Sequence, residues 1–69
     1  MTNEGILALA AMERLLKRSG AKRVSDNAKE SLRKELEKIA LNIGEKAVRF
    51  ANHSKRTTIK DRDIELAVK

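Results

Sequence analysis

The sequence predicts an all-α fold that two copies of the chain share. Its 69 residues contain no proline and only three glycines, so helical periodicity continues with few interruptions. Apolar residues recur at steps of three and four positions in three successive segments. The middle segment is too long for one chain of this size to cover, and we therefore expect a second copy beside it.

The first predicted helix lies near the N-terminus and ends before a glycine. Its apolar stripe comprises Ile6, Leu9, Met12 and Leu16. Lys17 and Arg18 occupy its last turn, where positive charge interacts favourably with the helix dipole. Gly20 follows as the expected left-handed residue at the helix end.

The second predicted helix extends over residues 26–52, with Ser25 as its cap. Its apolar stripe comprises Ala28, Leu32, Leu36, Ile39, Ile43, Ala47 and Phe50. Such a helix measures about 40 Å at 1.5 Å per residue, whereas a compact monomer of this size is roughly 28 Å across. A symmetric dimer with crossed long helices is the simplest closed arrangement that covers the stripe.

The third predicted helix is short and extends from about Lys60 or Asp61 through Val68. Two basic segments rich in β-branched residues, "KRVS" and "KRTTI", connect the three helices. The sequence has no repeat, no low-complexity segment and no long linker, so residues 1–69 are predicted to form a single domain.

The composition favours a polyanionic partner and excludes several other kinds of site. Sixteen Lys and Arg against ten Asp and Glu give a net charge of +6, which indicates nucleic acid first and a membrane surface second. With no cysteine and one histidine, the chain cannot form a disulfide or a four-ligand zinc site, and no metal or cofactor is expected. No apolar run reaches the ~20 residues that span a bilayer, and the start lacks a basic leader, so we expect a soluble cytoplasmic protein.

The basic residues concentrate near the two predicted loops. They are Lys17, Arg18, Lys22 and Arg23 in the first group and Lys55, Arg56, Lys60 and Arg62 in the second. The middle of the long helix mixes acids with bases, as an ordinary solvated face does. Phe50 is the only aromatic residue, which makes a single-strand or RNA binder with stacking platforms a poor interpretation.

Two stretches, "RSGAKRVSDNA" and "ALNIGEKAVRFANHSKRTTIKDRDIELAV", together with their spacing, resemble the archaeal histones over residues 14–68. The resemblance implies the histone fold, in which a short, a long and a short helix pair with a second chain in a handshake dimer. The first loop of one chain then lies beside the second loop of the other. It also implies a chromatin protein on the chromosome that binds, bends or wraps, and compacts double-stranded DNA without sequence specificity, while its dimers stack into tetramers or larger assemblies.

The resemblance also assigns residues to DNA. The implied contacts are Arg14, Lys17, Lys22, Arg23, Thr57, Thr58 and Lys60. Arg14 and Arg23 would be directed into the minor groove, and Thr58 of the other chain would steady Arg23. The remaining residues would contact phosphates, together with the N-termini of the first and second helices.

The single histidine is best explained as part of a contact between dimers. A general base would need a nucleophile or acid partner in a pocket, and neither is evident, so no enzyme is expected. The resemblance assigns Phe50, His53, Arg56 and Asp63 to the dimer–dimer interface. His53 would bind Asp63 of a neighbouring dimer and Arg56 would pair with Asp63 of its own chain, whereas an exposed helix-end histidine is the alternative. Gly20 would let adjacent turns of a superhelix stack closely.

Two departures and two rival interpretations remain. Lys55 and Thr57 stand where archaeal histones often have Gly and Lys, which suggests an altered backbone in the second loop and one cation fewer at each dimer edge. One rival is a histone-fold subunit of a heterodimeric transcription factor. The other is a protein whose amphipathic first helix binds anionic membranes. A paralogous histone is a further candidate partner.

Overall fold

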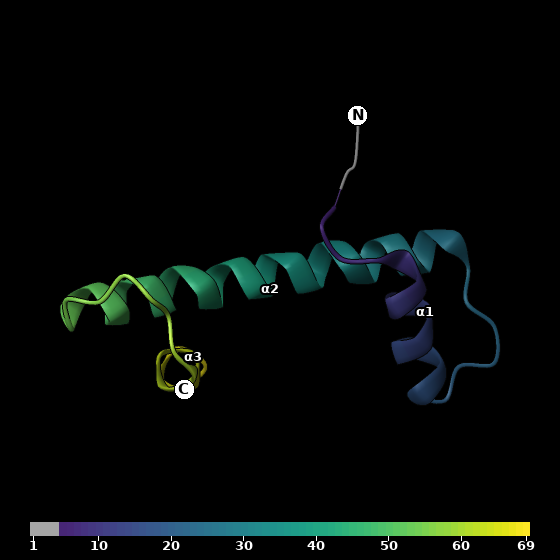
Figure 1. Cartoon of the computed structure of the whole chain (residues 1–69). Coiled ribbons are helices and arrows are strands. Elements are labelled where there is room, and N and C mark those ends of the chain that lie inside the picture. The colour runs from purple at the N-terminus through teal and green to yellow at the C-terminus, as the bar shows by residue number, and fades with distance from the viewer. Residues whose placement is uncertain (1–4) are drawn as a thin grey trace. The chain divides into compact units, whose positions relative to one another are not determined.

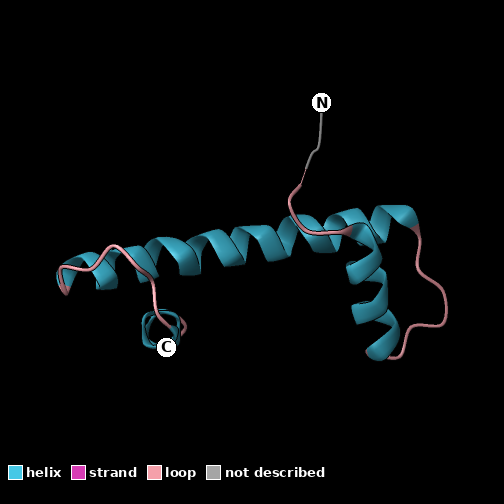
Figure 2. Ribbon diagram, in the orientation of Figure 1, coloured by secondary structure: helices cyan, strands magenta, loops and turns pink. Residues whose placement is uncertain are grey.

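The chain contains three α-helices in a computed structural model that describes residues 5–69. They are α1 (Leu9–Arg18), α2 (Asp26–His53) and α3 (Asp61–Ala67), and Figures 1 and 2 show them in this order. The described residues include no strand. The predicted all-α fold with a long central helix is therefore confirmed.

The start of α1 differs from the expectation, because Ile6 precedes the helix instead of belonging to its apolar stripe. The backbone N–H groups of Ile6 and Leu7 donate to Oε2 of Glu37 on α2, the second over 2.8 Å. Gly5 also approaches α2 so closely that an added Cβ would collide with the side chain of Arg33. These contacts hold residues 5–7 against α2, and the helix begins only at Leu9.

The end of α1 is closed by a Schellman motif. The N–H of Gly20 donates to the carbonyl oxygen of Lys17 over 3.0 Å, and the N–H of Ala21 donates to that of Leu16 over 3.1 Å. Gly20 has φ +114°, a conformation that only glycine adopts without strain. The predicted role of Gly20 as the end of the first helix is confirmed.

Helix α2 ends with the same hydrogen-bond pattern but without a glycine. The N–H of Lys55 donates to the carbonyl oxygen of Asn52 over 2.9 Å, and the N–H of Arg56 donates to that of Ala51 over 2.9 Å. Lys55 has φ 61°, in the left-handed region that glycine favours. The loop therefore keeps its backbone conformation despite the lysine, contrary to the expected alteration, and Lys55 bears the strain.

The start of α2 is capped by Ser25, whose hydroxyl oxygen accepts the N–H of Ala28 over 3.1 Å. The helix has 28 residues and hence a length of about 42 Å at 1.5 Å per residue. The internal contacts of the chain form two compact units that divide between Lys38 and Ile39, inside this helix. The first unit contains α1 and the second contains α3 (Figure 1). A single domain over residues 1–69 stays a prediction.

The described part of the chain buries very little apolar surface. Its buried apolar residues are Met12, Ala47, Ala51 and Ala67. Of the predicted α2 stripe only Ala47 is buried, whereas Ile39 is 55% exposed and Phe50 is 39% exposed. Three small alanines and one methionine do not make the core of an independently stable protein. The apolar stripe of α2 thus requires a covering surface that one chain does not supply.

Candidate nucleic-acid interface

Helix α1 presents its positive charge on the side opposite to its buried face. Its apolar side packs through Met12, which is buried, and Leu16, which is half-buried. Arg14, Lys17 and Arg18 are all exposed. The predicted contact residues Arg14 and Lys17 are therefore accessible to a ligand.

A network of ion pairs around Glu13 links α1 to the first turn of α2. The Glu13 carboxylate lies 3.1 Å from Nζ of Lys17 and 3.5 Å from Nζ of Lys29. Lys29 also lies 3.1 Å from Oδ1 of Asp26. The hydrogen bond from Lys17, followed by the charge of Lys29, lowers the pKa of the Glu13 carboxyl. Lys17 is thus partly neutralised by its own helix, which the family resemblance did not reveal.

The first loop, residues 19–25, carries Lys22 and Arg23, and both are exposed. The Schellman motif of Gly20 and the cap by Ser25 fix its two ends. Neither Lys22 nor Arg23 forms an ion pair with any described residue of the chain. Both cations are therefore available to an anionic partner.

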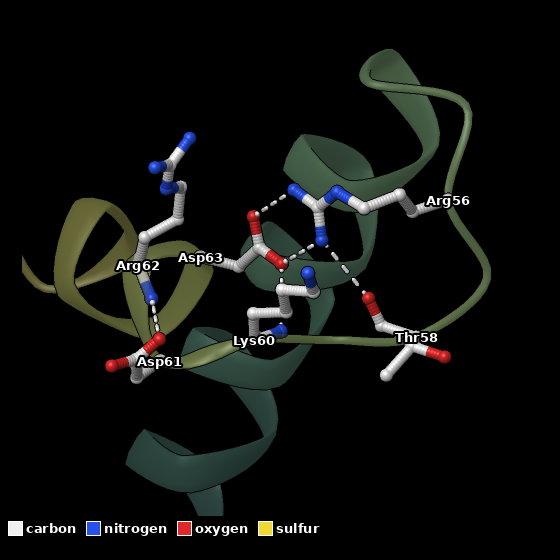
Figure 3. Close-up of polar contacts among 6 residues, drawn as sticks. All are labelled: Arg56, Thr58, Lys60, Asp61, Arg62 and Asp63. Atoms are coloured by element: carbon white, nitrogen blue, oxygen red, sulfur yellow. Dashed lines mark hydrogen bonds and ion pairs between the residues drawn. The ribbon is translucent and has the colours of Figure 1, made fainter.

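The second loop, residues 54–60, is held by one arginine and one aspartate (Figure 3). Arg56 forms a bidentate pair with Asp63, with Nη1–Oδ2 at 2.9 Å and Nη2–Oδ1 at 3.0 Å. Nη1 also donates to the carbonyl oxygen of Thr58 over 3.0 Å. The N–H of Lys60 donates to Oδ2 of Asp63 over 2.8 Å, which caps the start of α3. We name these residues, Arg56, Thr58, Lys60 and Asp63, the loop clamp.

The charges of the loop clamp stabilise the ionised form of Asp63. The hydrogen bonds from Arg56 and then from the Lys60 N–H lower the pKa of Asp63 from 3.8 to about 2. The same hydrogen bond from Asp63 raises the pKa of Arg56. Asp63 is only 1% exposed, so its pairing with Arg56 removes what would otherwise be an uncompensated buried charge.

The loop clamp fixes the backbone of the second loop and leaves its side chains free. The side chains of Thr57, Thr58 and Lys60 are exposed, although Arg56 binds the backbone oxygen of Thr58. Figure 3 shows Arg62 pointing away from the Arg56–Asp63 pair. The predicted phosphate contacts of this loop are thus presented from a rigid backbone.

The predicted dimer–dimer residues are not equally accessible in the chain. Phe50 and His53 are exposed near the end of α2, Arg56 is half-buried, and Asp63 is buried. The pairing of Arg56 with Asp63 within one chain is present, as the resemblance implied. A histidine of a second dimer would reach Asp63 only after the side chains that cover it had moved. The roles of these residues between dimers stay predictions.

Two further searches concern sites of other kinds. Within residues 5–69 no group of three or more His, Cys, Asp or Glu side chains is arranged to hold a metal ion. None of the described helices combines the length and the apolar character that crossing a membrane requires.

An all-helical chain with an uncovered apolar stripe on its central helix and basic loops before and after that helix has the features of a histone-fold, DNA-binding protein. Residues 6–68 match the model of the family described as histone-like transcription factor (CBF/NF-Y) and archaeal histone. The chain belongs to this family. The membership makes it a structural, DNA-binding protein of chromatin that pairs with histone partners, and it implies no enzyme.

Two archaeal relatives show how far the similarity extends. The chain is 44% identical over 63 residues to a protein of Thermococcus zilligii that is named as one of the subunits of archaeal histone HAN1. It is 43% identical over 63 residues to the protein named probable archaeal histone 3 of Methanocaldococcus jannaschii. Each match covers 91% of this chain and 94% of the relative.

Proposed function

We propose that two copies of this chain form a handshake homodimer that binds, bends and compacts double-stranded DNA without sequence specificity, on the chromosome in the cytoplasm. The observation that carries the proposal is the uncovered apolar stripe of α2, which has basic loops before and after it. A second copy offers the same stripe in return, and a symmetric interface of this kind closes on itself.

The exposed cations and the loop clamp supply a means of holding the DNA backbone. In the handshake arrangement, the first loop of one chain lies beside the second loop of the other, so Arg23 would meet Thr58 of its partner. Arginines there enter the minor groove and respond to its width, not to its sequence. Lys22, Thr57 and Lys60 contact phosphates on either side, which ties the affinity to salt concentration.

The dimer is tested by the mass of the purified chain in solution. A homodimer predicts twice the chain mass together with a helical circular dichroism spectrum over a range of concentrations. A well-folded single chain of 69 residues would contradict the proposal, because the α2 stripe would then need no partner.

DNA binding is tested by fluorescence anisotropy with two unrelated duplexes and one single strand at several salt concentrations. The cations Arg14, Lys17, Lys22, Arg23 and Lys60 amount to ten per dimer, so log K against log salt should have a slope near −9, from about −0.9 for each contact. Equal affinity for both duplexes is expected. A strong preference for one sequence, or for the single strand, would contradict the proposal.

Stacking of dimers is the finer part of the proposal, and we assign it to Phe50 and His53. Nuclease digestion of reconstituted complexes should give a ladder with regular increments, and His53→Ala should shorten it. Asp63→Ala is a poor test, because Asp63 also closes the loop clamp of its own chain. A single protected length in the unmodified protein would indicate a closed particle instead of an extending stack. Gly20, beside which an added Cβ meets no described atom within 4 Å, leaves room for a neighbouring turn.

The alternative is a histone-fold protein that pairs with a different chain, as in a transcription factor. The family description includes histone-like transcription factors, and one relative is named as part of a histone with more than one kind of chain. This alternative predicts that the purified chain alone is unfolded or aggregated and that a paralogous histone restores its helicity. A stable homodimer in the mass measurement would exclude an obligate need for such a partner.

A further inference from the structure

A shallow groove on α1 brings two arginines together over a small apolar floor. Ala11, Arg14, Leu15 and Arg18 line it. Leu15 is 47% exposed, although it lies on an amphipathic helix. The groove contains a residue, Arg18, to which neither the family resemblance nor the DNA contacts proposed above assign a role.

The helical positions explain why Arg18 and Arg14 act on the same side. With 3.6 residues per turn, Arg18 lies about 40° around the helix from Arg14 and one turn farther along it. Buried Met12 lies about 160° from Arg14, on the opposite side. Whatever ligand contacts Arg14 therefore lies within reach of Arg18.

The charge partners of α1 separate Arg18 from its neighbour Lys17. Lys17 lies about 60° from Arg14 in the other direction, and its Nζ is held 3.1 Å from the Glu13 carboxylate. Neither Arg14 nor Arg18 forms an ion pair with any residue from 5 to 69. Two like charges at positions i and i+4 destabilise a helix unless a counter-charge lies between them. The arginine pair is thus complete only with an anion bound.

We infer that Arg18 is a DNA-contact residue of α1 and that it binds the phosphate backbone beside the minor groove that Arg14 enters. Ala11 and Leu15 form the apolar floor on which the deoxyribose rests. Lys17 contributes much less than Arg18, because DNA would have to displace it from Glu13. The inference deepens the proposed function and rests on it.

The test compares Arg18→Ala with Lys17→Ala as its matched control, since both remove one exposed cation from the last turn of α1. Duplex affinity is measured by fluorescence anisotropy from 50 to 400 mM salt, and thermal unfolding is followed in parallel. Arg18→Ala removes two contacts per dimer, so the salt slope should become less steep by about 1.8. Counterion release of about eightfold per contact at 0.1 M salt places the affinity loss at up to about sixtyfold. Lys17→Ala should change both quantities by less than half as much.

Three outcomes would overturn the inference. Equal slopes for Arg18→Ala and the unmodified chain would remove Arg18 from the DNA surface. A larger effect of Lys17→Ala would reverse the order of the two residues. A lower melting temperature for Arg18→Ala with an unchanged slope would show that Arg18 only stabilises the C-terminus of α1. If the unmodified chain itself does not bind duplex DNA, the proposed function fails, and this result is separate from the other three.

Discussion

The lysine at the end of α2 offers a direct test of how the second loop is built. Lys55 occupies the position of the Schellman motif that Gly20 occupies at the end of α1, and its φ of 61° lies in the left-handed region. That conformation costs an L-residue about 1–2 kcal/mol. Replacement by glycine removes this cost but adds about 0.4–1 kcal/mol of entropy to the unfolded chain. Lys55→Gly should therefore stabilise each chain by about 0.5–1 kcal/mol.

The assay is thermal unfolding at one fixed chain concentration, because the stability of a dimer depends on concentration. For a chain of this size, 1 kcal/mol corresponds to about 4–8 °C, so Lys55→Gly should raise Tm by roughly 2–8 °C. Lys55→Ala is the matched control, since it removes the same charge and retains a Cβ at positive φ. The control should melt within about 2 °C of the unmodified protein.

Two results would refute this reasoning. A Tm for Lys55→Gly that equals that of Lys55→Ala would show that the backbone of Lys55 is not strained. A Tm below that of Lys55→Ala would show that glycine loosens the loop more than it relieves it. The two variants lose the same cation, so they should bind duplex DNA with equal affinity if the loop clamp is intact in both.

Two other features of the chain lead to further predictions. Because its pKa is lowered to about 2 in the folded chain, Asp63 contributes stability above pH 4 that is lost as the pH falls toward 2; acid unfolding followed by circular dichroism should show a steeper loss in the unmodified chain than in Asp63→Asn, and parallel curves would contradict this. Glu37→Ala should accelerate hydrogen exchange at the amides of Ile6 and Leu7 by at least about tenfold, whereas Glu35→Ala, which removes an exposed acid from the same helix, should leave them unchanged. Equal exchange in the two variants would show that Glu37 does not hold this segment.

The sequence predicted the parts of the fold that depend on neighbouring residues. Helix α2 was expected over residues 26–52 and ends at His53, because its cap Ser25 and its apolar steps are local signals. Gly20 marked the end of α1 for the same reason. The start of α1 was missed, since the acceptor that holds Ile6 and Leu7 is Glu37, about 30 positions away in the sequence.

The candidate site divides in the same way. The exposed cations of both loops could be read from the sequence, because lysines and arginines in polar segments are seldom buried. The burial of Asp63 could not, since an acid in the first turn of a helix is usually exposed. The pairing of Glu13 with Lys17 was a readable signal, because a glutamate four positions before a lysine on a helix commonly forms an ion pair. It would have separated Lys17 from Arg18 at the outset.

The small number of buried apolar side chains affects how such a protein is made in the cell. A newly synthesised chain has almost no stable folded state to occupy before it meets another chain, so folding and pairing become one bimolecular event. The supply of usable protein then rises more steeply than the rate of synthesis at low expression, and unpaired chains remain open to proteolysis. Any paralogue translated at the same time competes during folding, which makes relative expression the control over which pairs form.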